Sequence, residues 1–290
     1  MNTNEFVAGE SKCLTYFVCL KYELRKVLAG ALKSILVRKK KTTSSFIVKS
    51  RYTASEAKKI VRNEGLALNG YQPSWFYTSF ERLNTDPLTN CCLQFIEDNV
   101  PKDSSILITG CGTGIMVFHL ADAGFRSVEG RDLLQKCIRV ASRLKEQFNY
   151  TNTSFLVDDG FQPKLDNKYD LITALHWVFS AWMGNYGNTA KEDPRNPIVR
   201  ERLLVELLGA YSNNLNKDGL IIIELIDAIT DYREPFDHPL GLQSLDIYPV
   251  RHTPEQVSKC AHLVGLKVID KKLVVSYGHH PRTGYFLKKV

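Results

Sequence analysis

This 290-residue sequence has no regularly spaced cysteine pairs. Its N-terminal segment has few acidic residues and no long uncharged run. Its seven cysteines are an odd number and show no C-x-x-C spacing, which disfavours a secreted disulfide scaffold and predicts a reducing, cytoplasmic location. Apolar residues make up 44% and charged residues 24% of the chain, a balance that excludes disordered, collagen-like and coiled-coil proteins. The composition therefore predicts a globular protein of one large or two modest domains.

The scarcity of acids is confined to the start of the chain. Residues 1–62 carry 14 Lys or Arg against four acids, a balance of +10, whereas the other 228 residues carry 24 bases against 27 acids, a balance of −3. The net charge of +7 thus comes from the N-terminal segment, and the body of the protein lacks the basic balance of a nucleic-acid-binding surface. No nucleic-acid partner is expected.

The N-terminal segment has the pattern of an amphipathic helix. From Cys13 to Val37, apolar residues recur at steps of three and four between lysines and arginines. The longest uncharged runs there, Cys13–Leu20 and Val27–Leu32, have eight and six residues, far fewer than the roughly 20 that a membrane-spanning helix needs. The first ten residues contain no cation, so a signal peptide is not expected either.

We expect residues 12–41 to dock on the protein's own domain or on a partner subunit. The alternative is peripheral contact with the inner face of a membrane, because the helix ends in the four cations Arg38–Lys41. Residues 1–50 are predicted to form this basic helical extension and a hinge. Residues 51–290 are predicted to form the main domain, in which residues 51–85 are a helical lead-in or lid.

The period of the pattern changes after Asp86. A helix is predicted over residues 86–99, with Asp86 as its N-cap and Pro87 in its first position. The short apolar run Ser105–Thr109 has the pattern of a buried strand and ends at a turn with glycines at positions 110, 112 and 114. Helices over residues 116–123 and 133–148, on either side of a strand over residues 127–129, complete one βαβ unit. Such a unit brings backbone N–H groups and a helix N-terminus close to a ligand.

The spacing of the glycines separates two kinds of ligand. A dinucleotide fingerprint, G-x-G-x-x-G, needs glycine at position 115, where the sequence has Ile115. The order of Gly110, Gly112 and Gly114 instead resembles motif I of the class I S-adenosylmethionine-dependent methyltransferases, although the acid of that motif is replaced by Ile108. The resemblance covers about residues 86–290. It implies an α/β fold with a Rossmann-like, mostly parallel sheet of seven strands, an antiparallel terminal strand, helices on both faces, and S-adenosylmethionine as the cofactor.

The resemblance also assigns residues to the cofactor. Asp132 would accept from the ribose hydroxyls, with Glu129 as the competing candidate, and Asp159 would accept from the adenine amino group, with Phe161 along the ring. The alternative for Asp159 is a purely local role in the turn before Gly160. The implied cofactor-binding residues are Gly110, Cys111, Gly112, Gly114, Asp132, Leu133, Asp159, Gly160, Phe161 and Leu175.

Further strands follow in the order that the resemblance requires. A fourth strand is expected at Tyr169–Leu175 and a fifth at residues 219–224, and a helix beginning near Thr253 precedes the apolar residues 266–269. The last two strands are predicted over residues 273–276 and 285–288, with a turn between them.

Three segments should meet beyond the carboxyl ends of the parallel strands, where open α/β sheets bind ligands. His176, directly after the fourth strand, is the first candidate for a general base, and His279 and His280 in the terminal turn are the next. The alternative for His176 is a backbone contact with the cofactor and a structural side chain. No metal site is expected, because adjacent histidines do not converge on one ion. The alternative is a metal bound by the cluster Asp227, Asp231, Asp237 and His238, whose more favoured role is to bind a polar acceptor. The candidate acceptor-binding residues are Trp177, Trp182, Tyr186, Asp227, Asp231, His238 and Arg282.

The sequence thus predicts an O-methyltransferase acting on a hydroxyl of a small molecule, a sugar or a glycan. The Asn-Pro-Pro-Tyr or Asp-Pro-Pro-Tyr signature of amino-methylating DNA enzymes is missing after the fourth strand. The alternative is a cofactor-binding but catalytically inactive partner or scaffold subunit. Ile108 favours this alternative, whereas Gly112, Gly114 and Asp132 count against it.

Overall fold

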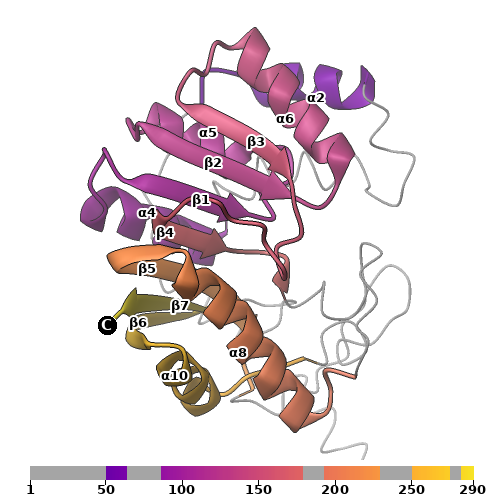
Figure 1. Ribbon diagram of the computed structural model, residues 1–290. Coiled ribbons are helices and arrows are strands. Elements are labelled where there is room, and N and C mark those ends of the chain that lie inside the picture. Colours follow the sequence, from indigo (N-terminus) through magenta and orange to yellow (C-terminus); the bar gives the residue numbers. More distant parts are fainter. Residues whose placement is uncertain (1–49, 64–85, 179–192, 229–249, 275–281) are drawn as a thin grey trace, which may run out of the picture. The chain divides into compact units, whose positions relative to one another are not determined.

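The computed structural model divides the chain into two compact units, Met1–Ser45 and Phe46–Val290. It describes residues 50–63, 86–178, 193–228, 250–274 and 282–290, all of which belong to the second unit (Figure 1). The predicted N-terminal helix and residues 64–85 of the predicted lead-in lie outside the described residues. Across the described ranges, no helix is both long enough and apolar enough to cross a membrane.

The second unit is built on one seven-stranded sheet with the order β3-β2-β1-β4-β5-β7-β6 (Figure 1). Neighbouring strands pair in parallel from β3 through β5, and β7 pairs antiparallel with both β5 and β6. The predicted fold, a mostly parallel Rossmann-like sheet with an antiparallel strand from the end of the chain, is confirmed. The strands are β1 (Ser105–Thr109), β2 (Ser127–Asp132), β3 (Thr153–Val157), β4 (Tyr169–Ala174), β5 (Leu215–Ile226), β6 (Leu266–Val274) and β7 (Arg282–Lys289).

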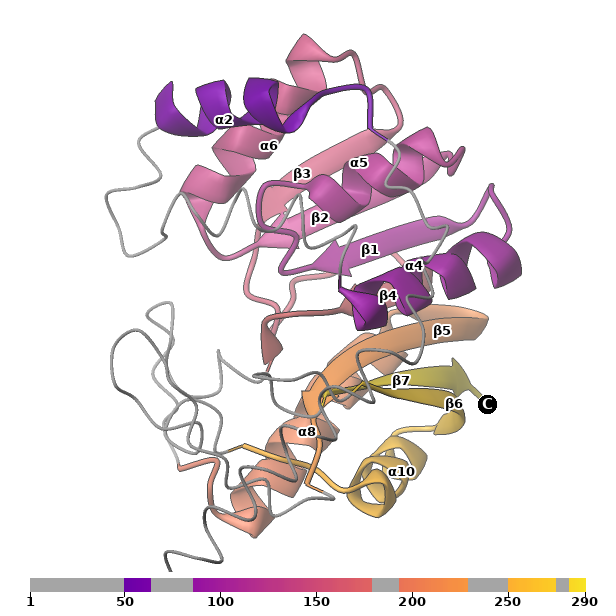
Figure 2. The same ribbon diagram turned by 180° about the vertical axis from the view of Figure 1, so that it is seen from behind.

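Helices cover both faces of the sheet, as the opposite views in Figures 1 and 2 show. Because side chains alternate along a strand, Ile106 and Ile108 of β1 pack under α4 and α5, whereas Leu107 faces the core beneath α8 and α10. Asp86 caps α4 and Pro87 is its first residue, as predicted. The helices are α2 (Ala54–Asn63), α4 (Pro87–Asn99), α5 (Ile115–Asp122), α6 (Gln135–Gln147), α8 (Pro197–Asn213) and α10 (Pro254–Leu263).

The last two strands differ from the prediction. Residues 266–269 and 273–276 were expected as separate apolar runs, but β6 is one strand over Leu266–Val274 with a register shift between Val268 and Asp270. The intervening charged residues are tolerated because β6 is an edge strand, and charges on an edge also oppose pairing with another chain. Apolar periodicity alone therefore divided a continuous strand.

The described part of the lead-in, α2, packs on α6 and α5. Tyr52, just before the helix, makes an edge contact with the ring of Phe118, at 5.5 Å between centroids. The Arg51 guanidinium binds the Asp122 carboxylate at 2.7 Å, and the Tyr150 hydroxyl donates to the same carboxylate at 2.6 Å. These contacts fix the start of α2 beside the last residue of α5.

The connection from β3 to β4, residues 158–168, contains no helix. Parallel strands of one sheet are usually connected through a helix, since the chain must return along the sheet before the next strand begins. Here polar contacts to β2 and α8 hold the connection instead, and they also shape part of the candidate site.

Candidate cofactor and acceptor site

The glycine turn after β1 has the backbone that its sequence predicts. Gly110, Gly112 and Gly114 have φ angles of 62°, 55° and 87°, in the left-handed region that glycine adopts without strain. Gly114 is also the N-cap of α5, and no side chain caps that helix. The first N–H groups of α5 therefore face the ligand end of the sheet, the usual place for binding a polar group.

The end of β2 is tied to this turn. The Asp132 carboxylate accepts from the N–H of Gly112 and from that of Leu134, each at 2.8 Å. Burial raises the pKa of Asp132, and these two backbone donors offset part of that effect. Each carboxylate oxygen can accept two hydrogen bonds, so both keep capacity for ligand hydroxyls. Glu129, the competing candidate, instead accepts from Arg131 and, at 2.9 Å, from the Tyr169 hydroxyl.

The other residues predicted to bind the cofactor differ in exposure and in chemical character. Burial raises the pKa of the Cys111 thiol well above its usual value, which keeps the thiol neutral, and the Cys111 N–H donates to the Arg131 carbonyl at 2.9 Å. The Leu175 side chain is buried in the core, so only its backbone faces the site. Leu133, by contrast, is 41% exposed directly after Asp132 and offers an apolar surface.

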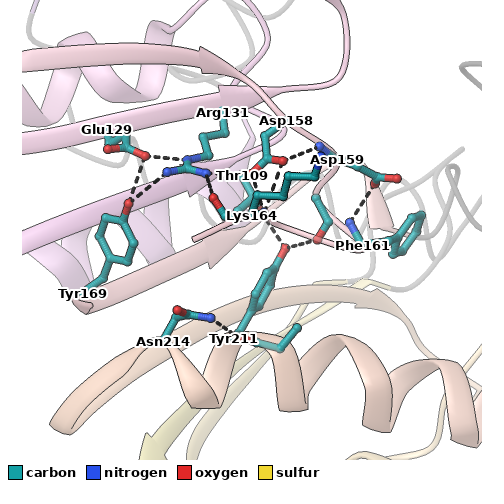
Figure 3. A network of polar contacts seen from close by, with 12 residues as sticks. Thr109, Glu129, Arg131, Asp158, Asp159, Phe161, Lys164, Tyr169, Tyr211 and Asn214 are labelled. Atoms are coloured by element: carbon teal, nitrogen blue, oxygen red, sulfur yellow. Dashed lines mark hydrogen bonds and ion pairs between the residues drawn. The ribbon is translucent and has the colours of Figure 1, made fainter. Parts of the chain in front are cut away.

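The turn after β3 is held by its own carboxylates and by Arg131 (Figure 3). Asp159 accepts from the Phe161 N–H through Oδ1 at 2.9 Å, which is the local turn role considered for it. Asp158 receives the Arg131 guanidinium at 2.8 Å. The same guanidinium donates to the Lys164 carbonyl at 2.7 Å, so one cation fixes both ends of the turn.

Trp177 lies on the cofactor side of the site. A Cβ atom on Gly110 would be 2.2 Å from indole Cδ1, and one on Gly160 would be 2.6 Å from Cη2. The indole therefore spans the glycine turn and the turn after β3, with the Phe161 ring in an edge contact at 4.9 Å between centroids. The sequence placed Trp177 with the acceptor, but its position groups it with the cofactor residues.

His176 follows β4 with a φ of 70°, an uncommon conformation for a residue other than glycine and one found often at functional sites. Its backbone N–H donates to Glu224 at 2.9 Å, and its Nδ1 lies 3.3 Å from the same carboxylate oxygen. Its Nε2 lies 2.6 Å from the Thr89 hydroxyl. The imidazole is 39% exposed, so it lies at the surface of the site with both nitrogens beside protein groups.

The hydrogen bonds of Thr89 indicate which of the two residues, His176 or Thr89, donates the proton in the contact between them. The Thr89 hydroxyl lies 2.5 Å from Asp86 Oδ2 and has one proton to give. Burial raises the pKa of Asp86, but Arg282, with smaller contributions from His176 and Thr89, more than offsets this and lowers it. Asp86 is thus ionised at neutral pH and takes the Thr89 proton, so Nε2 of His176 donates to Thr89. In this arrangement Nε2 is a donor and not a base.

An ion-pair cluster lies beneath His176. Arg282, at the start of β7, binds Asp86 at the N-cap of α4 and, at 2.8 Å, Glu224 of β5. Glu224 is 1% exposed and the Asp86 side chain 9%, and both of these buried carboxylates accept from the one guanidinium of Arg282, whose side chain is 15% exposed. Arg282 was predicted to bind the acceptor, but its contacts give it a supporting role for the backbone of His176.

Asp227 does not face an acceptor. It is 1% exposed, and its carboxylate accepts from the Thr283 hydroxyl of β7 at 2.7 Å, so burial leaves the acceptor prediction without support. The other predicted site residues, Trp182, Tyr186, Asp231, His238, His279 and His280, lie outside the described residues. Within the described ranges, no three His, Cys, Asp or Glu side chains are grouped to hold a metal ion.

Sequence reasoning missed the residues that arrange this site. Glu224 was detectable, because it is a charge inside the apolar strand β5 and such a charge needs a buried partner, whereas Arg131 lies in the mostly polar strand β2 and gave no such signal. Asp86 was recognised only as a helix cap. Tyr211 of α8, which contacts the turn after β3, gave no signal, since a tyrosine on an amphipathic helix is ordinary.

Parts of the sequence are similar to known methyltransferases. A family model described as a methyltransferase domain matches residues 106–190. The ribosomal protein L11 methyltransferase of Staphylococcus carnosus is 25% identical over 141 residues, which are 48% of this chain and 45% of the relative. That of Polynucleobacter necessarius is 32% identical over 91 residues, 30% of this chain and 27% of the relative. The chain thus spans less than half the length of these two relatives.

Solved structures agree on the fold. Magnesium protoporphyrin IX methyltransferase from Synechocystis, with bound SAH, has a TM-score of 0.54 at 16% identity and covers 82% of this chain and 96% of its own. A structure of the same enzyme with bound SAM has a TM-score of 0.51 at 15% identity and covers 83% of this chain and 100% of its own. Residues 106–190 thus match a methyltransferase domain, and the chain has the class I, Rossmann-like fold of solved methyltransferases that bind SAH or SAM.

Proposed function

We propose that this protein is an S-adenosylmethionine-dependent methyltransferase that methylates a hydroxyl of a small molecule, a sugar or a glycan. The observation that carries the proposal is the hydrogen bond between the glycine turn and Asp132, in which the Gly112 N–H donates to the carboxylate at 2.8 Å. It combines a left-handed turn at a helix N-terminus with a carboxylate one strand away, inside a domain that matches the methyltransferase model.

The residues present fit this cofactor. Asp132 keeps acceptor capacity for two neighbouring hydroxyls, and Leu133 and Val157, which are 41% and 52% exposed at the ends of adjacent strands, offer apolar surface to a ring. In our proposal Asp132 holds the ribose, Asp159 accepts from the adenine amino group, and Trp177 borders the nucleoside. When bound, the cofactor supplies an electrophilic methyl group.

The proposal of a hydroxyl acceptor rests on His176. Its imidazole is partly exposed at the carboxyl end of β4, and Glu224 lies against Nδ1, an arrangement that orients an imidazole for proton transfer. Nε2 becomes available only when an acceptor hydroxyl takes the place of Thr89. The acidic balance of residues 63–290 supports a small-molecule or glycan acceptor over a nucleic acid.

A second candidate is a cofactor-binding subunit without catalytic activity. Two observations favour it. Ile108, at the position of the motif I acid, is 2% exposed in the core, and both nitrogens of His176 are already engaged. This candidate predicts tight binding of the adenosyl cofactor and no turnover.

Calorimetry and methyl transfer on the full chain separate these proposals. The protein is titrated with S-adenosylhomocysteine and then incubated with S-adenosylmethionine and panels of hydroxylated metabolites and oligosaccharides. Binding followed by the gain of one methyl group on an acceptor, seen by mass spectrometry, supports the enzyme. Binding with no transfer to any acceptor favours the inactive subunit, and absence of binding contradicts both.

A further inference from the structure

The Tyr211 hydroxyl joins the two turns of the candidate cofactor site. Tyr211 is completely buried on α8, and its hydroxyl lies 2.8 Å from the Gly160 carbonyl and 3.0 Å from the Thr109 hydroxyl (Figure 3). The Gly160 carbonyl can only accept, so it takes the phenolic proton. The Thr109 hydroxyl lies on the other side, and its own proton is shared between the phenolic oxygen and the Thr173 carbonyl, 2.8 Å away. Thr109 is the residue before Gly110, so one atom connects the turn after β3 to the glycine turn.

Arg131 fixes the other side of the turn after β3. Its guanidinium binds Asp158 and the Lys164 carbonyl, at 2.8 Å and 2.7 Å, from within β2 (Figure 3). Since residues 158–168 contain no helix, these bonds and the Tyr211 bond take over the task of positioning the turn. Arg131 holds Asp158 and Lys164, and Tyr211 holds Gly160 between them.

Both turns pack against one side chain, the Trp177 indole. Gly110 and Gly160 both contact the Trp177 indole, and a Cβ at either position would lie within 2.6 Å of one of its atoms. A movement of Gly160 would therefore also displace the indole. A site held at its working separation before the ligand arrives binds more tightly, because less ordering remains to be done on binding.

We propose that Tyr211 is a positioning residue for the nucleoside part of the cofactor, acting through the Gly160 carbonyl and Thr109. The proposal rests on the proposed function, since it assumes that an adenosyl ligand binds across these turns. Tyr211 itself touches no ligand. Its hydroxyl sets the distance between the turns. In this proposal its hydrogen bond is needed for tight binding of the ligand and is not needed for folding.

Tyr211→Phe tests this by removing one oxygen and keeping the ring. We expect the variant to bind S-adenosylhomocysteine about fivefold to thirtyfold more weakly by calorimetry, the effect of losing one buried hydrogen bond at the site. Adenosine should lose affinity in the same proportion, because the defect lies at the nucleoside. Hydrogen exchange at the N–H groups of Phe161 and Gln162, which bond to Asp159, should become faster in the free variant.

Tyr150→Phe is the matched control. Its hydroxyl donates to Asp122 at the last residue of α5, so its loss affects a buried tyrosine that the cofactor turns do not contact. We expect unchanged affinity for S-adenosylhomocysteine and unchanged exchange at Phe161. A merely structural role for Tyr211 predicts that both variants lower the melting temperature and that neither changes affinity.

The outcomes separate this proposal from the proposed function. If the wild-type protein binds no adenosyl ligand, the proposed function fails. If the wild type binds and Tyr211→Phe binds equally well, the role of Tyr211 is refuted and the proposed function stands. Should Tyr211→Phe not fold, Thr109→Val removes the hydroxyl on the other side. A twofold to fivefold loss of affinity then supports the proposal, and full affinity overturns it.

Discussion

Replacing Arg282 with methionine should destabilise the protein by about 3 to 5 kcal/mol at neutral pH, the usual range when one partner of a buried ion pair is removed. The guanidinium is bound by Asp86 and Glu224, and both carboxylates would stay buried without a cation. Methionine fills much of the same space, so the expected loss is electrostatic and not a packing defect.

The pH dependence follows from Asp86. Burial raises its pKa, but Arg282 more than offsets this, so its folded pKa lies below the unfolded value. In the wild type, this group stabilises the fold above its unfolded pKa and loses that contribution as the pH falls through the folded pKa. In Arg282→Met burial is opposed only by the smaller contributions of His176 and Thr89, so the pKa of Asp86 rises relative to wild type, and the stability deficit should be largest at neutral pH and shrink in acid.

Urea unfolding at pH 7 and at about pH 4.5 measures both effects. Arg202→Met is the control, because Arg202 forms an exposed i,i+4 pair with Glu206, whose loss should change stability by less than about 1 kcal/mol. Adding Asp86→Asn to Arg282→Met should recover part of the loss. A deficit below about 1 kcal/mol, or one that is equal at both pH values, would refute the electrostatic reasoning.

Three further predictions concern the cofactor and the N-terminal segment. Asp132→Ala should weaken S-adenosylhomocysteine binding about tenfold to a hundredfold in calorimetry, because a charge-assisted acceptor is lost, and equal affinity would remove Asp132 from the site. Gly160→Ala should reduce the same affinity, since its Cβ would lie 2.6 Å from the Trp177 indole; a tightly binding variant would show that the indole moves freely. Deleting residues 1–45 should leave the affinity unchanged and alter oligomer size or recovery with membranes, and loss of binding would place part of the site in the first unit.

The first strands and the glycine turn were predictable because their signals are local, whereas the arrangement of the sheet was implied by the family resemblance. Apolar runs bounded by turn residues located β1 and β4, and three glycines at alternate positions required left-handed backbone. Asp132 was found by its place after β2. These features depend on neighbouring residues in the sequence, so one sequence is enough to find them.

The side-chain contacts of the candidate site were not predictable, since they join residues from elements that are distant in the sequence. Arg282 joins two carboxylates that are 138 residues apart in the chain, Asp86 and Glu224. Nothing in the spacing of these three residues says that they meet. The same holds for Tyr211 and Gly160, which are 51 residues apart and are joined by one hydroxyl.

His176 is where the sequence and the structure lead to different expectations, and His176→Asn separates them. Asparagine tolerates the positive φ of this position and its backbone N–H still reaches Glu224, so the variant removes the imidazole and keeps the turn. If the imidazole takes the proton of a hydroxyl acceptor, turnover should fall about a hundredfold, with part of the rate returning at high pH, where the acceptor ionises unaided. Alanine variants at His279 and His280 belong in the same assay. Full activity of His176→Asn, together with a loss in either of these, would move the base to the terminal turn. Full activity in all three would mean that holding donor and acceptor together is sufficient for transfer.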